Sequence, residues 1–386
     1  MAPSKSIFFI YRRIIINSVL SVIKQNQQSL KLYAITLDTN ISKAKDISQA
    51  FSPEYVHINN EKSFTETKED AQINSKILNG KSDLNALINN DNVDIIVSAI
   101  TGFAGLEATS IASKTGKTVL LANKESIVAA GELILLSAES SGTTIIPIDS
   151  EHNAIFQCLA GEKNTEDVSK IIITASGGPF LNKSLSSLKG VTKAQALRHP
   201  NWSMGSKISI DSATLVNKCL ELIEAKYLFG LDEHFFELVI HPQSIVHSIV
   251  SYRDGSSICQ MSNPDMTVPI AHALSDSRRL NNNFDAINFS SLNLTFNEFP
   301  EDRKDLENIA RDVCNKGNSS GVVFNAANEV AVKSFLEDEI AFNQIYDVIY
   351  RTFEATPMSN ITDIESIYEK DTESRMEAKK VVKSIT

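Results

Sequence analysis

Carboxylates in two separate segments of this sequence have the types and spacing of a divalent-cation site. Asp149 and Glu151 directly follow residues 143–148, a β-branched run that predicts a buried strand. Alternate residues of an extended chain point the same way and lie about 7 Å apart, so both carboxylates could bind one ion. Asp149 and Ser150 could equally cap a helix that begins near Asn153, and these residues alone do not decide between the two interpretations.

Glu221 is the third carboxylate. Residues 211–212, Asp-Ser, are typical of a helix N-cap, and residues 213–229 have helical periodicity. Residues three and four apart are neighbours on a helix, so Asn217, Lys218 and Glu221 should share one arc of its surface. By itself, such an arc more commonly indicates a solvent-exposed helix face that carries a lysine–glutamate pair.

Hydroxyl, glycine and histidine residues between these carboxylates form a second set of candidates. Ser176 precedes two glycines at residues 177–178, which can turn backbone N–H groups toward an anion or simply form a structural turn. His199 and Trp202 lie in the sparsely hydrophobic segment 181–206. A tryptophan in a loop bounded by proline and glycine suits a mobile lid, and an anchor in a minor core is the alternative.

The elements that position these residues begin with alternating strands and helices. Strands are predicted at residues 93–100 and 118–122, each followed by a helix, at 106–114 and 125–138. Such alternation predicts a parallel, doubly wound sheet. Asn123, Lys124 and Glu125 would lie at the carboxyl edge of this sheet, where ligands bind in such folds.

The rest of the chain predicts an open sheet followed by helices. Residues 235–252 and 257–261 indicate strands, residues 281–300 read as a linker, and the pattern beyond residue 302 is helical to the end. The expected fold class is therefore α/β, with a Rossmann-like N-terminal domain, an α+β catalytic domain and a C-terminal helical bundle. The expected boundaries are 1–148 for the first domain, 149–275 for the catalytic domain, 276–301 for the linker and 302–386 for the bundle.

Length and composition exclude several classes of protein. A chain of 386 residues exceeds the usual limit of about 250–300 residues for one core, so several domains are expected. The net charge of −10 argues against a nucleic-acid partner. Four scattered cysteines without a CxxC pair suit a reducing compartment and exclude a structural zinc site of the usual kind. No apolar run approaches the ~20 residues of a membrane span, and no signal peptide is expected.

Together with other segments in the same order, these motifs resemble the 1-deoxy-D-xylulose-5-phosphate reductoisomerase family. The matching segments are Leu121-Ala122-Asn123-Lys124-Glu125-Ser126, Asp149-Ser150-Glu151, Ser176-Gly177-Gly178-Pro179, residues 199–205, residues 212–221, His241-Pro242-Gln243-Ser244 and Asn325-Ala326-Ala327-Asn328-Glu329. The resemblance extends over roughly residues 93–335, and agreement of so many irregular motifs is hard to produce by chance.

The resemblance implies an enzyme that uses NADPH to isomerise and reduce a phosphosugar, 1-deoxy-D-xylulose 5-phosphate, to 2-C-methyl-D-erythritol 4-phosphate. This reaction belongs to the non-mevalonate isoprenoid pathway. The resemblance also implies a homodimer in the bacterial cytoplasm, with no nucleic-acid or membrane partner.

Site residues follow from the same resemblance. The implied ligands of Mg²⁺ or Mn²⁺ are Asp149, Glu151 and Glu221. The residues implied in catalysis are Lys124, Asp149, Glu151, His199 and Glu221. Substrate would also contact Ser150, with Ser176, Ser212, Asn217 and Lys218 holding its phosphate. The cofactor would contact Asn40, Asn123, Glu125 and Gly205, while Trp202 and Met204 would cover the closed site.

The N-terminal segment departs from the family. A strand near residues 7–10 and a helix near 17–25 suit a first Rossmann unit, but the family's turn G-x-T-G-S-I-G is replaced by Ile10-Tyr11-Arg12-Arg13-Ile14-Ile15-Ile16. No glycine precedes Gly80. Bulky residues prevent the close backbone approach to a pyrophosphate that glycine permits, although Arg12 and Arg13 could attract phosphate. A diverged cofactor site and a frameshift, with the frame restored near residue 17, both explain the segment.

A second departure concerns the cofactor's 2′-phosphate. Asp38, after a strand at residues 32–37, would repel that phosphate if it pointed there, although Lys43 and Lys45 are near. Two further hypotheses therefore stand beside the enzyme: a cofactor-impaired or inactive relative that retains phosphosugar binding, and a phosphosugar-binding scaffold. The intact metal and phosphate motifs argue against the scaffold.

Overall fold

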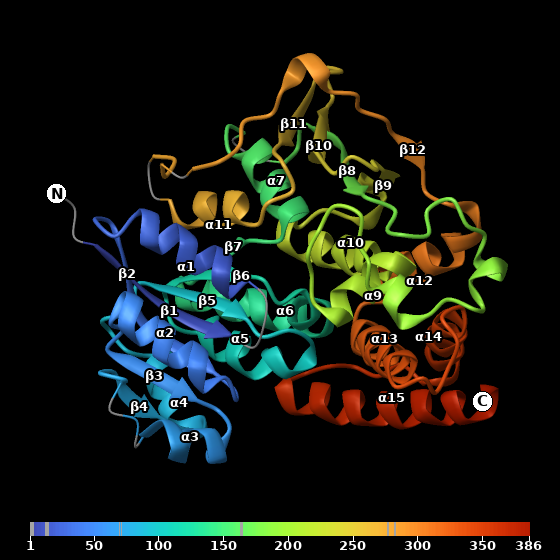
Figure 1. Cartoon of the computed structure of the whole chain (residues 1–386). Coiled ribbons are helices and arrows are strands. Elements are labelled where there is room, and N and C mark those ends of the chain that lie inside the picture. The colour runs from blue at the N-terminus through green and yellow to red at the C-terminus, as the bar shows by residue number, and fades with distance from the viewer. Residues whose placement is uncertain are drawn as a thin grey trace. The chain divides into compact units, whose positions relative to one another are not determined.

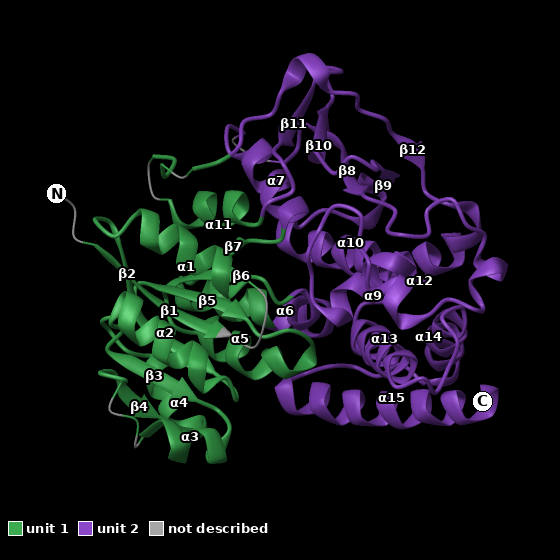
Figure 2. Cartoon of the chain, in the orientation of Figure 1, with its two compact units in different colours: residues 1–123, 134–149, 266–284 green, residues 124–133, 150–265, 285–386 purple. Residues whose placement is uncertain are grey.

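Each of two units is built from non-contiguous parts of the chain (Figure 1, Figure 2). The structure, a computed structural model, describes residues 4–11, 15–68, 70, 72–162, 165–275, 278–281 and 283–386. Unit 1 comprises residues 1–123, 134–149 and 266–284, and unit 2 comprises residues 124–133, 150–265 and 285–386. The functional division at residues 148, 275 and 301 remains a prediction, because the units are defined by packing alone.

Unit 1 contains a parallel sheet of seven strands in the order β4-β3-β2-β1-β5-β6-β7. Its strands are β1 (Lys5–Tyr11), β2 (Leu30–Leu37), β3 (Tyr55–Ile58), β4 (Lys76–Leu78), β5 (Ile95–Ala99), β6 (Thr118–Leu121) and β7 (Thr144–Pro147). Its helices are α1 (Ile16–Gln25), α2 (Ile41–Phe51), α3 (Glu61–Lys68), α4 (Gly80–Ile88), η1 (Phe103–Gly105), α5 (Leu106–Ala112) and α11 (Thr267–Leu274). The predicted α/β fold class is confirmed.

Strand β1 shows why this sheet is buried on both faces. Ile7 and Phe9 belong to the cluster that packs with α1 and α11, whereas Phe8 and Ile10 belong to a separate cluster with residues of α4 and α5. Successive side chains of a strand point to opposite faces, so a continuous apolar run fills two cores at once. The order of the strands reverses between β1 and β5, and this reversal defines the crevice where doubly wound sheets bind ligands.

Strand β4 lies within residues 60–80, a polar segment rich in lysine and glutamate whose sequence predicts a solvated helix and loop and no strand. The structure pairs β4 in parallel with β3 at the edge of the sheet, after helix α3. An edge strand of three partly exposed residues carries no apolar run, so sequence pattern gives little sign of it.

Unit 2 contains a five-stranded sheet in the order β11-β10-β8-β9-β12, in which only β8 and β9 are parallel. Its strands are β8 (Val168–Ala175), β9 (Phe236–Ile240), β10 (Val246–Tyr252), β11 (Ser257–Met261) and β12 (Asn297–Glu298). The open sheet is as predicted, although the expected linker contributes β12 to it. Helix α7 (Ser150–Leu159) contacts β10 and β11, and Tyr252 donates a hydrogen bond to the Cys158 carbonyl at 3.1 Å.

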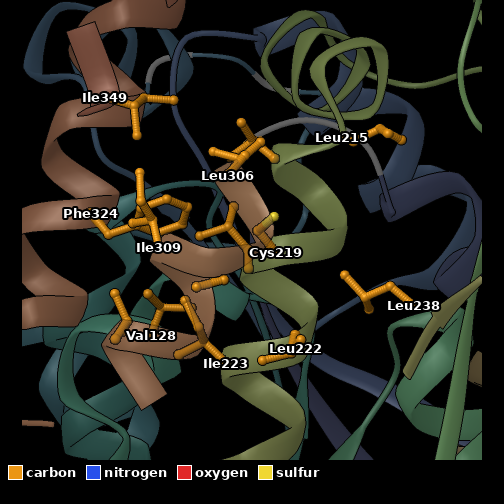
Figure 3. Close-up of a cluster of buried hydrophobic side chains, with 14 of the residues drawn as sticks. Val128, Leu215, Cys219, Leu222, Ile223, Leu238, Leu306, Ile309, Phe324 and Ile349 are labelled. Atoms are coloured by element: carbon orange, nitrogen blue, oxygen red, sulfur yellow. The ribbon is translucent and has the colours of Figure 1, made fainter. Parts of the chain in front are cut away.

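Helices complete unit 2 around one apolar core. They are η2 (Leu185–Leu188), α8 (Lys193–Ala196), α9 (Ser206–Thr214), α10 (Val216–Phe229), η3 (Glu233–Phe235), η4 (Phe289–Ser291), η5 (Glu301–Arg303), α12 (Lys304–Lys316), α13 (Ser320–Leu336), α14 (Gln344–Ala355) and α15 (Ile364–Ile385). Figure 3 shows Cys219 and Ile223 of α10 packed among Leu306, Phe324 and Ile349 of the C-terminal helices. The predicted C-terminal helical region is confirmed, and it shares its core with α10.

Helix α6 (Lys124–Ser141) is kinked at Ala130, whose φ of −141° and ψ of 20° are not helical. Residues 124–133 at its start belong to unit 2. There Gly321 of α13 lies so close that an added Cβ would be 1.9 Å from the Val128 carbonyl oxygen. Glycine at residue 321 therefore lets α13 pack against the turn that follows Lys124.

Candidate active site

Helix α7 begins at Ser150, earlier than predicted, and this changes how two of the carboxylates are presented. Glu151 lies in the first helical turn, so the expectation that Asp149 and Glu151 share one side of an extended chain is wrong. The N-terminal end of a helix carries partial positive charge, which favours carboxylates there. Asp149 is bonded to Ser150, and one carboxylate oxygen from each of Asp149, Glu151 and Glu221 lies within 4.8 Å of the others.

The helix that carries Glu221 also starts differently from the prediction. Residues 211–212 are not an N-cap: they lie inside α9, and Leu215, with a φ of 66°, separates α9 from α10. The Leu215 side chain is buried in the core of unit 2, which holds this strained turn in place. Ser212 and Asn217 consequently belong to different helices.

Two lysine ammonium groups form ion pairs with Glu151 and Glu221 in unit 2. Lys218 Nζ is 2.7 Å from Glu151 Oε1 and also contacts Glu221 Oε2, while Lys124 Nζ is 2.8 Å from Glu221 Oε1. Lys124 Nζ also donates to Asn217 Oδ1 at 2.8 Å. Burial by itself lowers the pKa of Lys218, but Glu151 and Glu221 raise it above its ordinary value. Asn217, Lys218 and Glu221 share one face of α10, as their spacing predicts.

The sequence analysis did not identify a histidine–carboxylate pair that adjoins Glu151 and Glu221. His152 Nδ1 lies 3.0 Å from Glu224 Oε2, and His152 Nε2 lies 2.8 Å from the backbone carbonyl of Glu221. Both side chains are fully buried and join α7 to α10. Two signals point to the pair: Glu224 is three residues beyond Glu221, and His152 directly follows Glu151. The pair fixes the backbone that presents both carboxylates.

The hydroxyl and imidazole candidates Ser176 and His199 contact each other directly in unit 2. His199 Nδ1 accepts hydrogen bonds from the backbone N–H groups of Asn201 and Trp202, at 3.1 and 2.9 Å. Its Nε2 therefore carries the ring hydrogen and donates to Ser176 Oγ at 2.9 Å. Burial lowers the pKa of His199 to about 4, so the ring is neutral at physiological pH. Ser212 lies beside this segment, because a Cβ on Gly178 would be 2.8 Å from the Ser212 carbonyl oxygen.

The Trp202 segment has anchors on unit 2. Asn201 Nδ2 donates to the Pro242 carbonyl at 2.7 Å and to Ser244 Oγ at 3.0 Å. The Trp202 ring lies 6.2 Å from the His247 ring and is only partly buried. A covering role for this segment, with Met204, remains a prediction. Gly205 forms the N-cap of α9, so its backbone starts the helix that leads to Ser212.

Three of the residues expected to contact cofactor have structural roles. Asn40 caps α2 by accepting from the Lys43 backbone N–H at 2.9 Å. Asn123 Nδ2 donates to the carbonyls of Ile100 and Gly102, at 2.6 and 2.9 Å, and thus holds the turn after β5. Glu125 is buried and paired with Lys207 at 2.7 Å.

Residues 10–16, which replace the family's glycine turn, connect β1 to α1. Arg12, Arg13 and Ile14 lie outside the described residues. Ile10 and Ile16, which stand where the family has the first and last glycine, are buried in the two cores of unit 1. The sheet topology therefore fits a dinucleotide, whereas the described ends of the turn do not supply a glycine cradle.

The 2′-phosphate candidates are engaged within unit 1. Asp38 accepts a long hydrogen bond of 3.4 Å from Asn59 Nδ2. Lys43 Nζ donates to Asn17 Oδ1 at 2.8 Å, and Lys45 Nζ pairs with Asp70 at 2.6 Å.

Comparison with known proteins identifies the family. A family model described as 1-deoxy-D-xylulose 5-phosphate reductoisomerase matches residues 15–131, and models of the family's C-terminal domains match residues 145–229 and 261–377. The 1-deoxy-D-xylulose 5-phosphate reductoisomerase of Shewanella piezotolerans is 40% identical over 385 residues, covering 95% of this chain and 96% of the relative. That of Acinetobacter baumannii is 43% identical over 383 residues, with the same coverage of 95% and 96%.

This chain belongs to the 1-deoxy-D-xylulose 5-phosphate reductoisomerase family. It is accordingly an enzyme, an NADP-dependent oxidoreductase. Solved structures agree: the Zymomonas mobilis reductoisomerase in complex with NADPH has a TM-score of 0.92 and 36% identity, covering 99% of this chain and 100% of that one. A DOX-P reductoisomerase in complex with NADPH, fosmidomycin and magnesium has a TM-score of 0.90 and 36% identity, covering 98% of both chains.

The reductoisomerase family model begins to match at residue 15, within the segment 10–16 that departs from the family turn. The relatives nevertheless align over 95% of this chain. Among the described residues, no helix combines the length and apolar character that crossing a membrane requires.

The neutral state of His199 gives a testable pH dependence. An unfolded histidine takes up its proton near pH 6.5, whereas folded His199 does so near pH 4. Between these values the unfolded chain binds more protons, so the free energy of unfolding should fall as the pH falls. We expect His199→Gln to lose less stability than the unmodified chain when urea unfolding is compared at pH 7.5 and pH 4.5.

The exposed His234 supplies the control for this measurement. His234→Gln replaces an exposed histidine and leaves the buried His199 in place, so this variant should retain the pH dependence that His199 gives the unmodified chain. Parallel losses of stability in the His199→Gln variant and the unmodified chain would contradict the neutral assignment.

Proposed function

We propose that this chain catalyses the NADPH-dependent isomerisation and reduction of 1-deoxy-D-xylulose 5-phosphate to 2-C-methyl-D-erythritol 4-phosphate. The observation that carries the proposal is the close group formed by Asp149, Glu151 and Glu221 in a chain that belongs to the reductoisomerase family. The solved reductoisomerase structures that resemble this chain include a complex with NADPH and a complex with magnesium.

The acidic group fits a hard divalent cation. Its oxygens are close enough to converge on one ion. Lys218 contacts Glu151 and Lys124 contacts Glu221, as expected where negative charge is concentrated. Asp149, Glu151 and Glu221 would hold Mg²⁺ or Mn²⁺, which when bound would polarise the carbonyl and hydroxyl oxygens of the substrate. Ser150 donates a hydrogen bond to Glu151 and thereby orients that carboxylate.

The phosphate end of the substrate would be held by hydroxyl, amide and ammonium groups. Ser176 Oγ accepts hydrogen bonds from His199 Nε2 and from the Gly178 backbone N–H, at 2.9 and 3.2 Å, so its own hydrogen is directed to another acceptor. A phosphate oxygen would be that acceptor, with Ser212, Asn217 and Lys218 as further donors. His199 therefore acts as a neutral donor that orients Ser176, and binding of the remote phosphate aligns the reacting end.

At the reacting end, Lys124 is the donor. Its ammonium group lies between Glu221 and Asn217, so both its charge and its direction are set before substrate arrives. It would donate to a substrate oxygen and stabilise negative charge that develops there. NADPH, when bound at the carboxyl edge of the unit 1 sheet, would supply the hydride. The proposed cofactor contacts are Asn40, Asn123, Glu125 and Gly205.

A homodimer in the bacterial cytoplasm completes the proposal. Strand β11 is the last strand at one edge of the unit 2 sheet, and Ser257, Ile258 and Cys259 along it are exposed. An exposed edge strand is a template for pairing with another strand. A second copy of this chain, paired antiparallel through β11, would continue the sheet across a two-fold axis.

The proposed metal site can be tested at Glu221. Glu221→Gln preserves size and helix propensity but removes one negative ligand, so turnover of 1-deoxy-D-xylulose 5-phosphate should fall by more than about 100-fold. The measurement is NADPH oxidation at limiting Mn²⁺, with the melting temperature recorded in parallel. Glu237→Gln, on the exposed surface of β9, is the matched control and should leave turnover unchanged. Normal turnover by Glu221→Gln would remove Glu221 from the metal site.

The cofactor turn can be tested by repair. Replacing residues 10–16 with the family turn G-x-T-G-S-I-G should increase NADPH affinity by at least about tenfold, because each backbone donor contributes roughly 0.5–1.5 kcal/mol or more to a charged acceptor. Fluorescence titration with NADPH measures this change, and Mn²⁺ binding should be equal in both versions. Equal NADPH affinity before and after repair would show that the glycine turn is dispensable here.

The proposed dimer can be tested through Cys259. An antiparallel pair of β11 strands centred near this residue would bring two copies of the exposed thiol together, so mild oxidation should give a covalent dimer on a non-reducing gel. Cys259→Ser should abolish the cross-link and retain the dimer mass by light scattering. A monomer mass would contradict the homodimer, and a dimer that does not cross-link would contradict pairing through this part of β11.

A further inference from the structure

Lys207 connects two elements of unit 2 that each carry proposed site residues. It is the second residue of α9, and its Nζ lies 2.7 Å from Glu125 Oε1 on α6 and 2.7 Å from Asp211 Oδ2, one turn further along α9. The carboxylate side chains of Glu125 and Asp211 are only 6% and 1% exposed. One ammonium group thus bridges two buried carboxylates on different helices.

The surroundings favour the charged forms of Lys207 and Glu125, whereas burial raises the pKa of Asp211 against the opposing effect of Lys207 and Asn328. Burial alone lowers the pKa of Lys207, but Asp211 and Glu125 raise it above its ordinary value. Burial raises the pKa of Glu125 and Lys207 lowers it, with a net lowering. Asn328 of α13 donates to Asp211 Oδ1 at 3.0 Å, so both oxygens of that carboxylate are engaged. A buried ammonium group with two ionic partners has little freedom to move.

The residues next to Glu125 and Asp211 connect this ionic group to the proposed site. Lys124 immediately precedes Glu125 in the first turn of α6, and its Nζ contacts Glu221 and Asn217 at 2.8 Å. Ser212 immediately follows Asp211. A displacement of Glu125 relative to Asp211 therefore displaces the backbone of Lys124 relative to that of Ser212.

We propose that Lys207 is a positioning residue whose ammonium group ties the first turn of α6 to α9 and so fixes the separation of Lys124 from Ser212. This inference rests on the proposed function, which places Lys124 at the reacting end of the substrate and Ser212 at its phosphate end. Lys207 itself touches neither end. Its role is to hold Lys124 and Ser212 at the separation that a ligand contacting both residues requires.

Ligands of different length distinguish this role from a general contribution to folding. A ligand that reaches both ends depends on their separation, and misplacement by about 1 Å can cost two orders of magnitude in a well-aligned site. A ligand that occupies one end does not depend on the separation. The suitable long probe is a phosphonate mimic of the substrate with a hydroxamate at its other end. The short probes are inorganic phosphate and Mn²⁺ alone.

The decisive variant is the double substitution Lys207→Met with Glu125→Gln. It removes the tie between α6 and α9 but leaves the summed charge of Lys207, Glu125 and Asp211 unchanged, and Asp211 keeps its hydrogen bond from Asn328. By titration calorimetry, the Kd of the long probe measured with Mn²⁺ should rise at least about tenfold. The Kd values of inorganic phosphate and of Mn²⁺ alone should stay within about threefold of those of the unmodified chain.

Arg311→Met is the matched control. Arg311 also bridges carboxylates in unit 2, at 2.6 Å from Glu233 and 2.7 Å from Glu307, but neither partner adjoins a proposed site residue. This variant should lower the melting temperature without weakening the long probe relative to the short ones. If the double variant does not fold, Glu125→Gln alone is used, because it weakens the tie and keeps the pair between Lys207 and Asp211.

Two results would overturn the inference. In one, the long probe binds the variant as tightly as it binds the unmodified chain. In the other, all three probes weaken in parallel, which would show that Lys207 only supports the fold. The proposed reaction is tested separately, by NADPH oxidation with 1-deoxy-D-xylulose 5-phosphate. Its absence in the unmodified chain would refute the reaction while leaving the comparison of probe affinities intact.

Discussion

The interaction on which the rest of the site depends is the compensation of buried negative charge in unit 2. Glu221 is almost completely buried, and such a carboxylate is stable only when a cation and hydrogen-bond donors surround it. Lys124 and Lys218 provide this here, and they arrive from different helices, α6 and α10. The requirement explains why the first turns of α6 must lie against α10, where a Cβ added to Gly131 would be 2.6 Å from the Tyr227 ring.

The site is assembled mainly from helix ends. Glu151 stands in the first turn of α7, Lys124 in the first turn of α6, and Ser212 in the last turn of α9 before the break at Leu215. Helix ends suit such a site because they combine unsatisfied backbone groups with side chains held by a rigid element. Two buried ionic contacts hold these helix ends in place. The pair His152–Glu224 joins α7 to α10, and the bridge made by Lys207 joins α6 to α9.

The first strand of unit 1 owes its place in the sheet to apolar packing rather than to a glycine turn. The first strand keeps its place in the parallel sheet because its alternate side chains fill cores on both faces, with Ile7 and Phe9 on one side and Phe8 and Ile10 on the other. That apolar packing requires no glycine. A glycine turn matters instead for how closely the backbone can approach a pyrophosphate, so its loss bears on cofactor binding far more than on the sheet.

Sequence alone determined the fold class, the alternation of strands and helices, and the arc of Asn217, Lys218 and Glu221, because these follow from local periodicity and from irregular motifs in a recognisable order. Tertiary structure decided the rest. It placed the helix break at Leu215 rather than an N-cap at residues 211–212, because a buried core side chain outweighs the local capping preference. It also paired Glu125 with Lys207, 82 residues away, and His152 with Glu224. Such pairs depend on which helices meet, and no local pattern carries that information.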